Sequence, residues 1–118
     1  MISPLARRTF KDGKPSNADL RLYANAARRV AEEEDVTFID LLGMSEKLLG
    51  TMTQDQADEF DAVGHADAKA ENAGKAAPAL DRTHLDDKGK VVFGRMVADA
   101  LIRTEVSLGP DVVGQATK

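Results

Sequence analysis

The feature that most constrains the fold is one β-branched and aromatic run that directly follows an amphipathic helix pattern. Residues 36–40 read Val-Thr-Phe-Ile-Asp, a nearly unbroken apolar run of strand length. In residues 16–33, apolar side chains recur about every 3.6 residues. A helix followed by such a strand is the second half of a βαβ unit, which belongs to a parallel sheet covered by helices. The pattern therefore predicts an α/β fold.

Residues 36–40 form the only complete strand that the sequence predicts convincingly. Ile2 reads as the end of another strand, and Pro4 ends any pairing there. One strand leaves backbone N–H and C=O groups unpaired along its edges, so a parallel sheet needs more neighbours than this sequence supplies. We therefore expect an incomplete sheet, as in a domain cut after its first strands. The uncovered apolar surface predicts that the isolated chain self-associates.

Capping signals divide the rest of the chain into helices. Residues 16–19 read Ser-Asn-Ala-Asp, a capping-box variant that opens the first helix, in which Tyr23 is expected in the core. Residues 41–49 predict a short helix ended by Gly50. The remaining expectations are a helix capped by Thr53 that runs to Phe60 or Val63, a loop over residues 64–78, a helix capped by Asp86 that runs to Arg103, and a flexible tail over residues 106–118.

Composition and charge exclude several classes of protein. With 42% hydrophobic and 31% charged residues, the chain does not have a disordered composition. The net charge is −4 and no Lys/Arg cluster follows one face, which argues against nucleic acid as a partner. The sequence contains no run of about 18 apolar residues, so it predicts no membrane span. The N-terminus shows no apolar segment of a signal peptide, and the absence of cysteine excludes a disulfide framework without fixing the compartment.

Two groups of polar residues are weak candidates for binding. Arg7 and Arg8 follow Pro4 in an expected loop, where they are either solvated side chains or contacts to an anion or a sugar at the carboxyl edge of the sheet. His65 and Asp67 are two residues apart and resemble part of a metal site. No third or fourth ligand has matching spacing, so we expect a solvated loop histidine and no bound metal.

The stretch with the clearest chemistry is residues 81–86, which read Asp-Arg-Thr-His-Leu-Asp. A histidine exchanges protons near neutral pH, and it does so well when a carboxylate fixes its ring through the other nitrogen. Asp81 and His84 supply such a pair. A nucleophile is missing, because no serine lies in a Gly-x-Ser-x-Gly elbow or follows Gly-Asp, and there is no cysteine. The serines are Ser3, Ser16, Ser45 and Ser107. A simpler interpretation is an unrelated α-rich domain in which His84 is a hydrogen-bonded loop histidine.

The order of these segments resembles a known family. Residues 3–10 (Ser-Pro-Leu-Ala-Arg-Arg-Thr-Phe) precede the amphipathic helix and the strand at 36–40, and residues 81–86 with Gly89 open the last helix. This order is similar to the C-terminal half of an SGNH (GDSL-type) hydrolase, with the rhamnogalacturonan acetylesterase-like carbohydrate esterases as the nearest branch. The resemblance covers residues 1–105.

The resemblance implies a flavodoxin-like, three-layer α/β/α fold and an ester hydrolase without a cofactor. His84 would be the general base and acid, Asp81 its orienting carboxylate, and an acetylated polysaccharide or small ester the substrate. Members of the family are often secreted or periplasmic. The family's Gly-Asp-Ser block, which carries the nucleophile, and its Gly-x-Asn block, which completes the oxyanion hole, do not occur in this sequence. We therefore expect the chain to be inactive alone, and a non-catalytic fragment or interaction module is the alternative.

Overall fold

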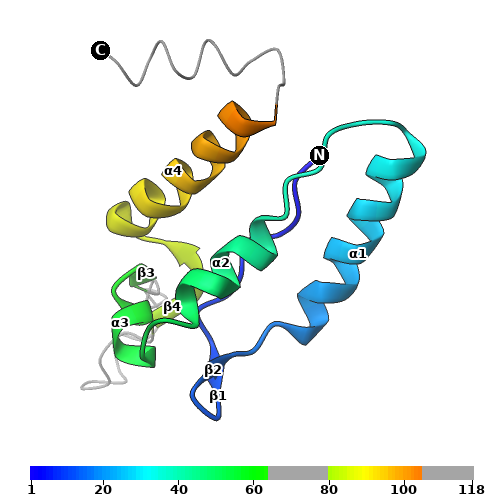
Figure 1. Ribbon diagram of the computed structural model, residues 1–118. Helices are drawn as coiled ribbons and strands as arrows, with labels where there is room; N and C mark the ends of the chain where they lie inside the picture. The colour runs from blue at the N-terminus through cyan, green and yellow to red at the C-terminus, as the bar shows by residue number, and fades with distance from the viewer. Residues whose placement is uncertain (64–79, 105–118) are drawn as a thin grey trace, which may run out of the picture.

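The computed structural model describes residues 1–63 and 80–104, which form four helices and two small antiparallel sheets (Figure 1). The elements in chain order are β1 (Phe10–Lys11), β2 (Lys14–Pro15), α1 (Ala18–Glu33), α2 (Leu41–Leu49), α3 (Gln54–Asp58), β3 (Asp61–Val63), β4 (Leu80–Leu85) and α4 (Asp87–Arg103). Helix α2 is central and packs against α1 and α4 (Figure 1). The predicted α/β class is therefore confirmed at the level of mixed helices and strands. The predicted tail over residues 106–118 lies outside the described residues.

The predicted strand at residues 36–40 is reduced to a single parallel bridge between Ile2 and Ile39. The Ser3 N–H donates to the Ile39 carbonyl at 3.0 Å, and the Ile39 N–H donates to the Met1 carbonyl at 2.9 Å. The direction of pairing agrees with the prediction, but neither segment forms a full strand. Ladder hydrogen bonds extend a strand only where a neighbour continues beside it, and within the described residues both named sheets are two-stranded and antiparallel.

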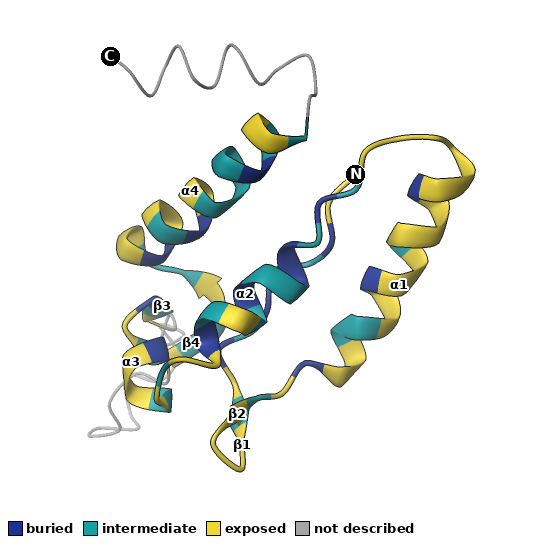
Figure 2. Cartoon of the chain, in the orientation of Figure 1, coloured by how far each residue is buried: buried dark blue, intermediate teal, exposed yellow. Residues whose placement is uncertain are grey.

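Helix α1 begins where the sequence predicts, but its cap and exposed face differ from the prediction. Asn17 is the N-cap residue, and its side chain makes no capping hydrogen bond. Instead its amide pairs with the backbone of Arg7, accepting from the N–H at 2.8 Å and donating to the carbonyl at 3.3 Å. Ala24 and Ala31 are buried, whereas Tyr23 is 67% exposed, so its prediction as a core residue is wrong. Figure 2 shows that most of α1 is exposed.

The other helix boundaries follow the capping signals. Asp40 caps α2 by accepting from the Gly43 N–H at 3.1 Å, and α2 ends before Gly50 as predicted. Thr53 forms the predicted capping box with Gln56, but α3 ends at Asp58 rather than at residue 60 or 63. Asp86 caps α4 through the Gly89 N–H at 2.7 Å, and the helix runs to Arg103 as predicted.

The sequence predicted neither two-stranded sheet, and the larger of the two is the hairpin of β3 and β4. Its antiparallel register pairs Asp61 with Leu85 and Ala62 with Asp81, with an irregularity between Asp61 and Ala62. Residues 82–84 therefore have no partner on β3. Alternation between two kinds of position is the signal that predicts a strand. In β4 the buried and exposed positions do not alternate, so this signal is missing.

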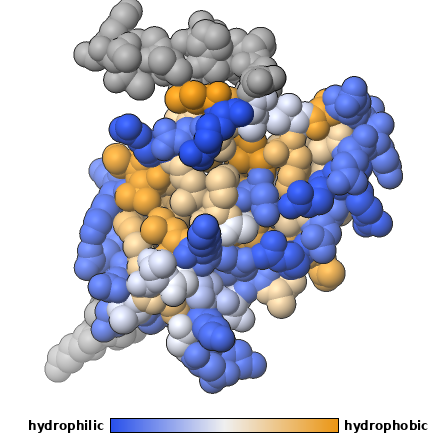
Figure 3. All heavy atoms as spheres, in the orientation of Figure 1, coloured by the Kyte–Doolittle hydropathy of each residue, from blue (hydrophilic) through white to orange (hydrophobic). Residues whose placement is uncertain are grey.

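The core lies around α2 and reaches the hairpin through two phenylalanines. Phe60, just before β3, and Phe93 on α4 meet edge to face, with ring centroids 5.4 Å apart. The buried apolar cluster consists of Ala6, Ala24, Leu42, Leu49, Ala57, Phe60 and Phe93. Apolar side chains also remain on the surface along α4 and across the middle of the face in Figure 3. Leu22 on α1 and Val91 on α4 are each 72% exposed.

Substitutions at two glycines of α4 test how closely this helix approaches the hairpin. A Cβ atom at Gly89 would lie 2.5 Å from the Phe60 carbonyl oxygen and 2.8 Å from a Leu85 methyl group, whereas one at Gly94 would meet nothing within 4 Å. We expect Gly89→Ala to lower the free energy of unfolding by about 1–3 kcal/mol, because the backbone must move apart. Gly94→Ala should raise it by about 0.5–1 kcal/mol through helix propensity. Urea denaturation followed by circular dichroism measures both, and equal shifts would contradict the close approach.

Candidate active site

The carboxylate of Asp81 and the imidazole of His84 form a direct hydrogen bond on β4. The distance from Asp81 Oδ2 to His84 Nδ1 is 2.6 Å. An ionised carboxylate can only accept hydrogen bonds, so the hydrogen lies on Nδ1 and the neutral ring presents Nε2 as an acceptor. This is the arrangement of a base and its orienting group, and the predicted geometry of the pair is confirmed at this contact.

The other oxygen of Asp81 ties the carboxylate to the local backbone. Oδ1 accepts from the Thr83 N–H at 2.9 Å and from the His84 N–H at 3.1 Å. Aspartate side chains commonly bond to backbone groups two and three residues ahead, so the Asp-x-x-His spacing itself produces this turn. The hydrogen bond from His84, followed by those from the two backbone N–H groups, lowers the pKa of Asp81 to about 2. Asp81 is therefore a fixed anion at neutral pH.

The pair is open to solvent beside a hollow of about 380 Å³, which is lined by Ala62, Val63, Asp81 and His84. The side chain of His84 is 77% exposed and that of Asp81 is 33% exposed. The hollow lies at the β3–β4 hairpin, and none of its lining residues comes from residues 36–40. Asp40, at the end of that segment, contacts Ser3, Gly43 and Arg28.

Neither arginine of the weak candidate pair is a free surface cation. Arg8 is fully buried, so its interpretation as a solvated or sugar-binding side chain is wrong for this structure. Its guanidinium donates to Asp61 Oδ1 at 2.5 Å, to the Ala6 carbonyl at 3.0 Å and to the His84 carbonyl at 2.9 Å. Arg7 remains partly exposed and pairs with Asp19 at 2.6 Å.

A second charged pair joins the same strand to the end of helix α3. Arg82 donates to both carboxylate oxygens of Asp58, at 2.8 and 2.9 Å. Gln54 donates to Asp58 Oδ1 and to the Arg8 carbonyl, each at 2.6 Å. The Arg82 guanidinium lowers the pKa of Asp58, whereas burial raises the pKa of Asp61 against the opposing effect of Arg8. Sequence reasoning did not find Asp58, Asp61 or Gln54 as supports for the site.

Two of the four serines are buried in structural roles. Ser3 is 3% exposed, and its hydroxyl accepts from the Leu42 N–H at 2.9 Å and lies 3.3 Å from Asp40 Oδ1. Ser45 is fully buried and bonds to the Ala6 N–H and to carbonyls of its own helix. Ser107 lies outside the described residues. Within residues 1–63 and 80–104, no serine hydroxyl bonds to His84.

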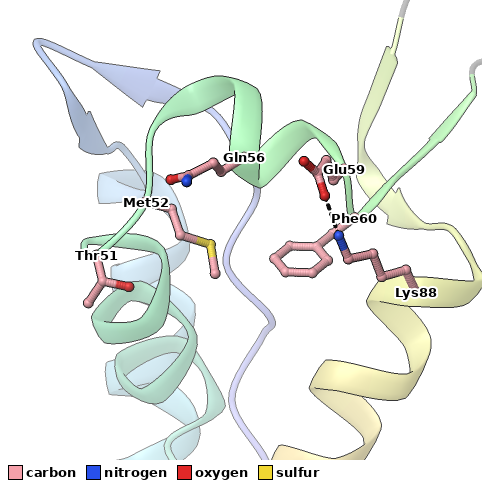
Figure 4. Close-up of a pocket in the computed structure, with 6 residues that line it drawn as sticks. All are labelled: Thr51, Met52, Gln56, Glu59, Phe60 and Lys88. Atoms are coloured by element: carbon pink, nitrogen blue, oxygen red, sulfur yellow. Dashed lines mark hydrogen bonds and ion pairs between the residues drawn. The ribbon is translucent and has the colours of Figure 1, made fainter.

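Two other hollows carry weaker chemistry. One, of about 360 Å³, has Met52 and Phe60 beside the ion pair of Glu59 and Lys88, and the dashed line in Figure 4 shows that these two charges satisfy each other. The other lies between residues 38–40 and the end of α4.

Among the described residues no group of three or more acidic or histidine side chains can hold a metal ion, and no helix there is long and apolar enough to cross a membrane. His65 and Asp67 lie outside these residues.

Comparison with known proteins leaves the geometry of this site as the basis for a functional conclusion. No protein-family model, no curated protein and no solved structure matches the chain.

The low pKa of Asp81 predicts a pH dependence with a defined sign. Because the pKa falls from 3.8 to about 2 on folding, the stabilisation from this carboxylate is complete above about pH 4 and is lost as the pH falls towards 2. In a carboxyl ¹³C NMR titration, Asp81 should show a midpoint near 2. His84→Ala should move that midpoint up towards 3.8 and leave Asp58, which pairs with Arg82, unchanged. An unchanged Asp81 midpoint would show that the ring does not bond to it.

Proposed function

We propose that this chain supplies the Asp–His part of a serine ester hydrolase that removes acetyl groups from carbohydrate. The observation that carries the proposal is the 2.6 Å hydrogen bond from His84 Nδ1 to Asp81 Oδ2, with the ring exposed beside an open hollow. The order of segments that resembles the SGNH hydrolases supports the choice of ester hydrolysis. The flavodoxin-like fold of that family belongs to the same proposal.

In the proposed reaction a serine from a Gly-Asp-Ser block outside this sequence attacks the acetyl carbonyl carbon. His84 Nε2 takes the hydroxyl proton and passes it to the sugar oxygen as the bond between that oxygen and the carbonyl carbon breaks. Water then attacks the acetyl-serine, His84 removes a proton from the water, and acetate leaves as the serine oxygen regains a proton. Asp81 holds the ring in the correct tautomer and stabilises the imidazolium form.

The surroundings of the pair are compatible with a small acyl group. Ala62 and Val63 contribute apolar surface to the hollow that Asp81 and His84 also line. An acetyl methyl group needs an apolar contact of this size, while the sugar remains in solvent. Arg7, whose side chain is partly exposed, stays a weak candidate for contact with the carbohydrate.

A non-catalytic interaction module is the second candidate function. The absence of the nucleophile and oxyanion blocks from the sequence and the exposure of Leu22, Tyr23 and Val91 favour it. In that case the Asp81–His84 bond would stabilise the hairpin and do no chemistry. The two candidates differ in whether His84 contributes to turnover once a nucleophile is supplied.

The chain alone should hydrolyse p-nitrophenyl acetate barely faster than free imidazole does at the same concentration. An imidazole without a positioned nucleophile acts only as a general base for water, an effect of about 10²–10⁴ at most. The oxyanion donors, worth about 10²–10³ each, would also be missing. The initial rate at pH 7–8 is compared with that of His84→Ala. Substantial turnover that depends on His84 would show that a serine of this chain is reactive.

Fusing the N-terminal half of a rhamnogalacturonan acetylesterase-like enzyme ahead of Met1 should produce an active esterase. His84→Ala in this fusion should abolish turnover, and Asp81→Asn should lower kcat by about 10⁴, because an amide favours the wrong ring tautomer. The matched control is Arg95→Ala, whose side chain is 78% exposed on α4 and should leave kcat unchanged. If the fusion binds a serine-directed phosphonate and its His84→Ala variant retains full activity, the proposal is contradicted.

A further inference from the structure

Arg8 contacts the strand of the candidate base from the far end of the sequence. Its backbone N–H donates to the Arg82 carbonyl at 3.2 Å, and its guanidinium Nη2 donates to the His84 carbonyl at 2.9 Å. The same guanidinium uses Nε on Asp61, the first residue of β3, and Nη1 on the Ala6 carbonyl. One buried side chain therefore joins the N-terminal segment to both strands of the hairpin.

These contacts fall where the hairpin itself provides none. Asp61 pairs with Leu85 and Ala62 with Asp81, so the three residues between Asp81 and Leu85 have no partner on β3. Two of the three carbonyls, those of Arg82 and His84, accept from Arg8 instead. Arg8 thus replaces the missing ladder contacts on both sides of Thr83, next to the residue whose ring must be oriented.

The geometry of a guanidinium makes this support rigid. Its planar fork fixes the directions of Nε and Nη2 relative to each other, so the hydrogen bond to Asp61 also sets where the His84 carbonyl lies. The side chains of Arg8 and Asp61 are 1% and 0% exposed, and a buried charge cannot leave its partner without a large loss of free energy. The backbone of His84 is therefore held against β3 while its ring stays in solvent.

We propose that Arg8 is a positioning residue for His84, which fixes the backbone of His84 so that ring Nδ1 meets the Asp81 carboxylate. This inference rests on the proposed function, in which His84 is the base, but it concerns the orientation of the ring and has its own measurement. Arg8 touches neither the hollow nor the reacting atoms and is not itself a catalytic residue.

The hydrogen bond can be observed in the unmutated 118-residue chain. We expect slowly exchanging Arg8 guanidinium hydrogens with a through-bond NMR coupling to the His84 carbonyl carbon. Long-range ¹H–¹⁵N spectra should show that the neutral form of the His84 ring carries its hydrogen on Nδ1. Absence of the Arg8–His84 coupling would overturn the inference, and this result does not depend on the folding of any variant.

Arg8→Lys tests the effect on the ring. Lysine retains a charge opposite Asp61 and loses the donor to the His84 carbonyl. We expect the chain to fold and the hydrogen of His84 to move from Nδ1 towards Nε2, the position preferred in free imidazole side chains. The matched control is Arg7→Lys, because Arg7 is partly exposed and pairs with Asp19, and it should leave the tautomer unchanged. A folded Arg8→Lys chain that keeps Nδ1–H fully occupied would overturn the inference.

A second variant decides the outcome if Arg8→Lys does not fold. The double variant Arg8→Met with Asp61→Leu removes both buried charges, and such replacements often preserve stability. The same tautomer change is expected, and an unchanged tautomer in the folded double variant would overturn the inference. In the active fusion the double variant should lower kcat by about 10-fold or more, because the base is held less firmly. KM should change little. A tautomer change in a fusion without esterase activity would refute the proposed function and retain the positioning role.

Discussion

The buried ion pair between Arg8 and Asp61 is the interaction on which the arrangement of the chain depends. Taking both charges out of water costs free energy, so the pair stabilises little compared with apolar side chains of the same size. Its value lies in specificity, because removing either partner leaves an uncompensated buried charge. Asp61 Oδ2 has no hydrogen-bond partner within the described residues, so Arg8 is the main compensation for this carboxylate. The pair thereby fixes which segment lies beside the hairpin.

The N-terminal segment is held to the helices by polar side chains as well as by its one parallel bridge. The hydroxyl of Ser3 accepts from the Leu42 N–H, that of Ser45 accepts from the Ala6 N–H, and the amide of Asn17 pairs with the Arg7 backbone. The bonds from Ser45 and Asn17 satisfy backbone groups that a continuous sheet would otherwise pair, whereas the bond from Ser3 satisfies an N–H in the first turn of α2. Side chains thus replace sheet contacts along the first eight residues, as Arg8 does on β4.

The features that the sequence predicted correctly are those set by neighbouring residues. The caps at Thr53 and Asp86 and the end of α2 before Gly50 depend on groups three or four residues away. The three-residue spacing that brings Asp81 within reach of His84 is local in the same sense, although the backbone of His84 is also bound by the distant Arg8. Burial of Arg8, the role of Asp61 and the exposure of Tyr23 depend on which distant segments pack together. A hairpin with a three-residue irregularity also carries no alternating pattern, so the sequence could not predict β3 and β4.

The exposure of the Asp81–His84 pair bears directly on the proposed ester hydrolysis. A carboxylate–imidazole hydrogen bond is weakened by competing water, and the His84 side chain is 77% exposed. An added nucleophile would meet a ring that solvent can still reach. In the proposed ester hydrolase, a segment that supplies the serine would also have to cover the hollow beside Ala62 and Val63, because excluding water strengthens the Asp81–His84 bond. Arg8 holds the backbone of His84 in place for that contact, because it binds the His84 carbonyl and leaves the ring accessible.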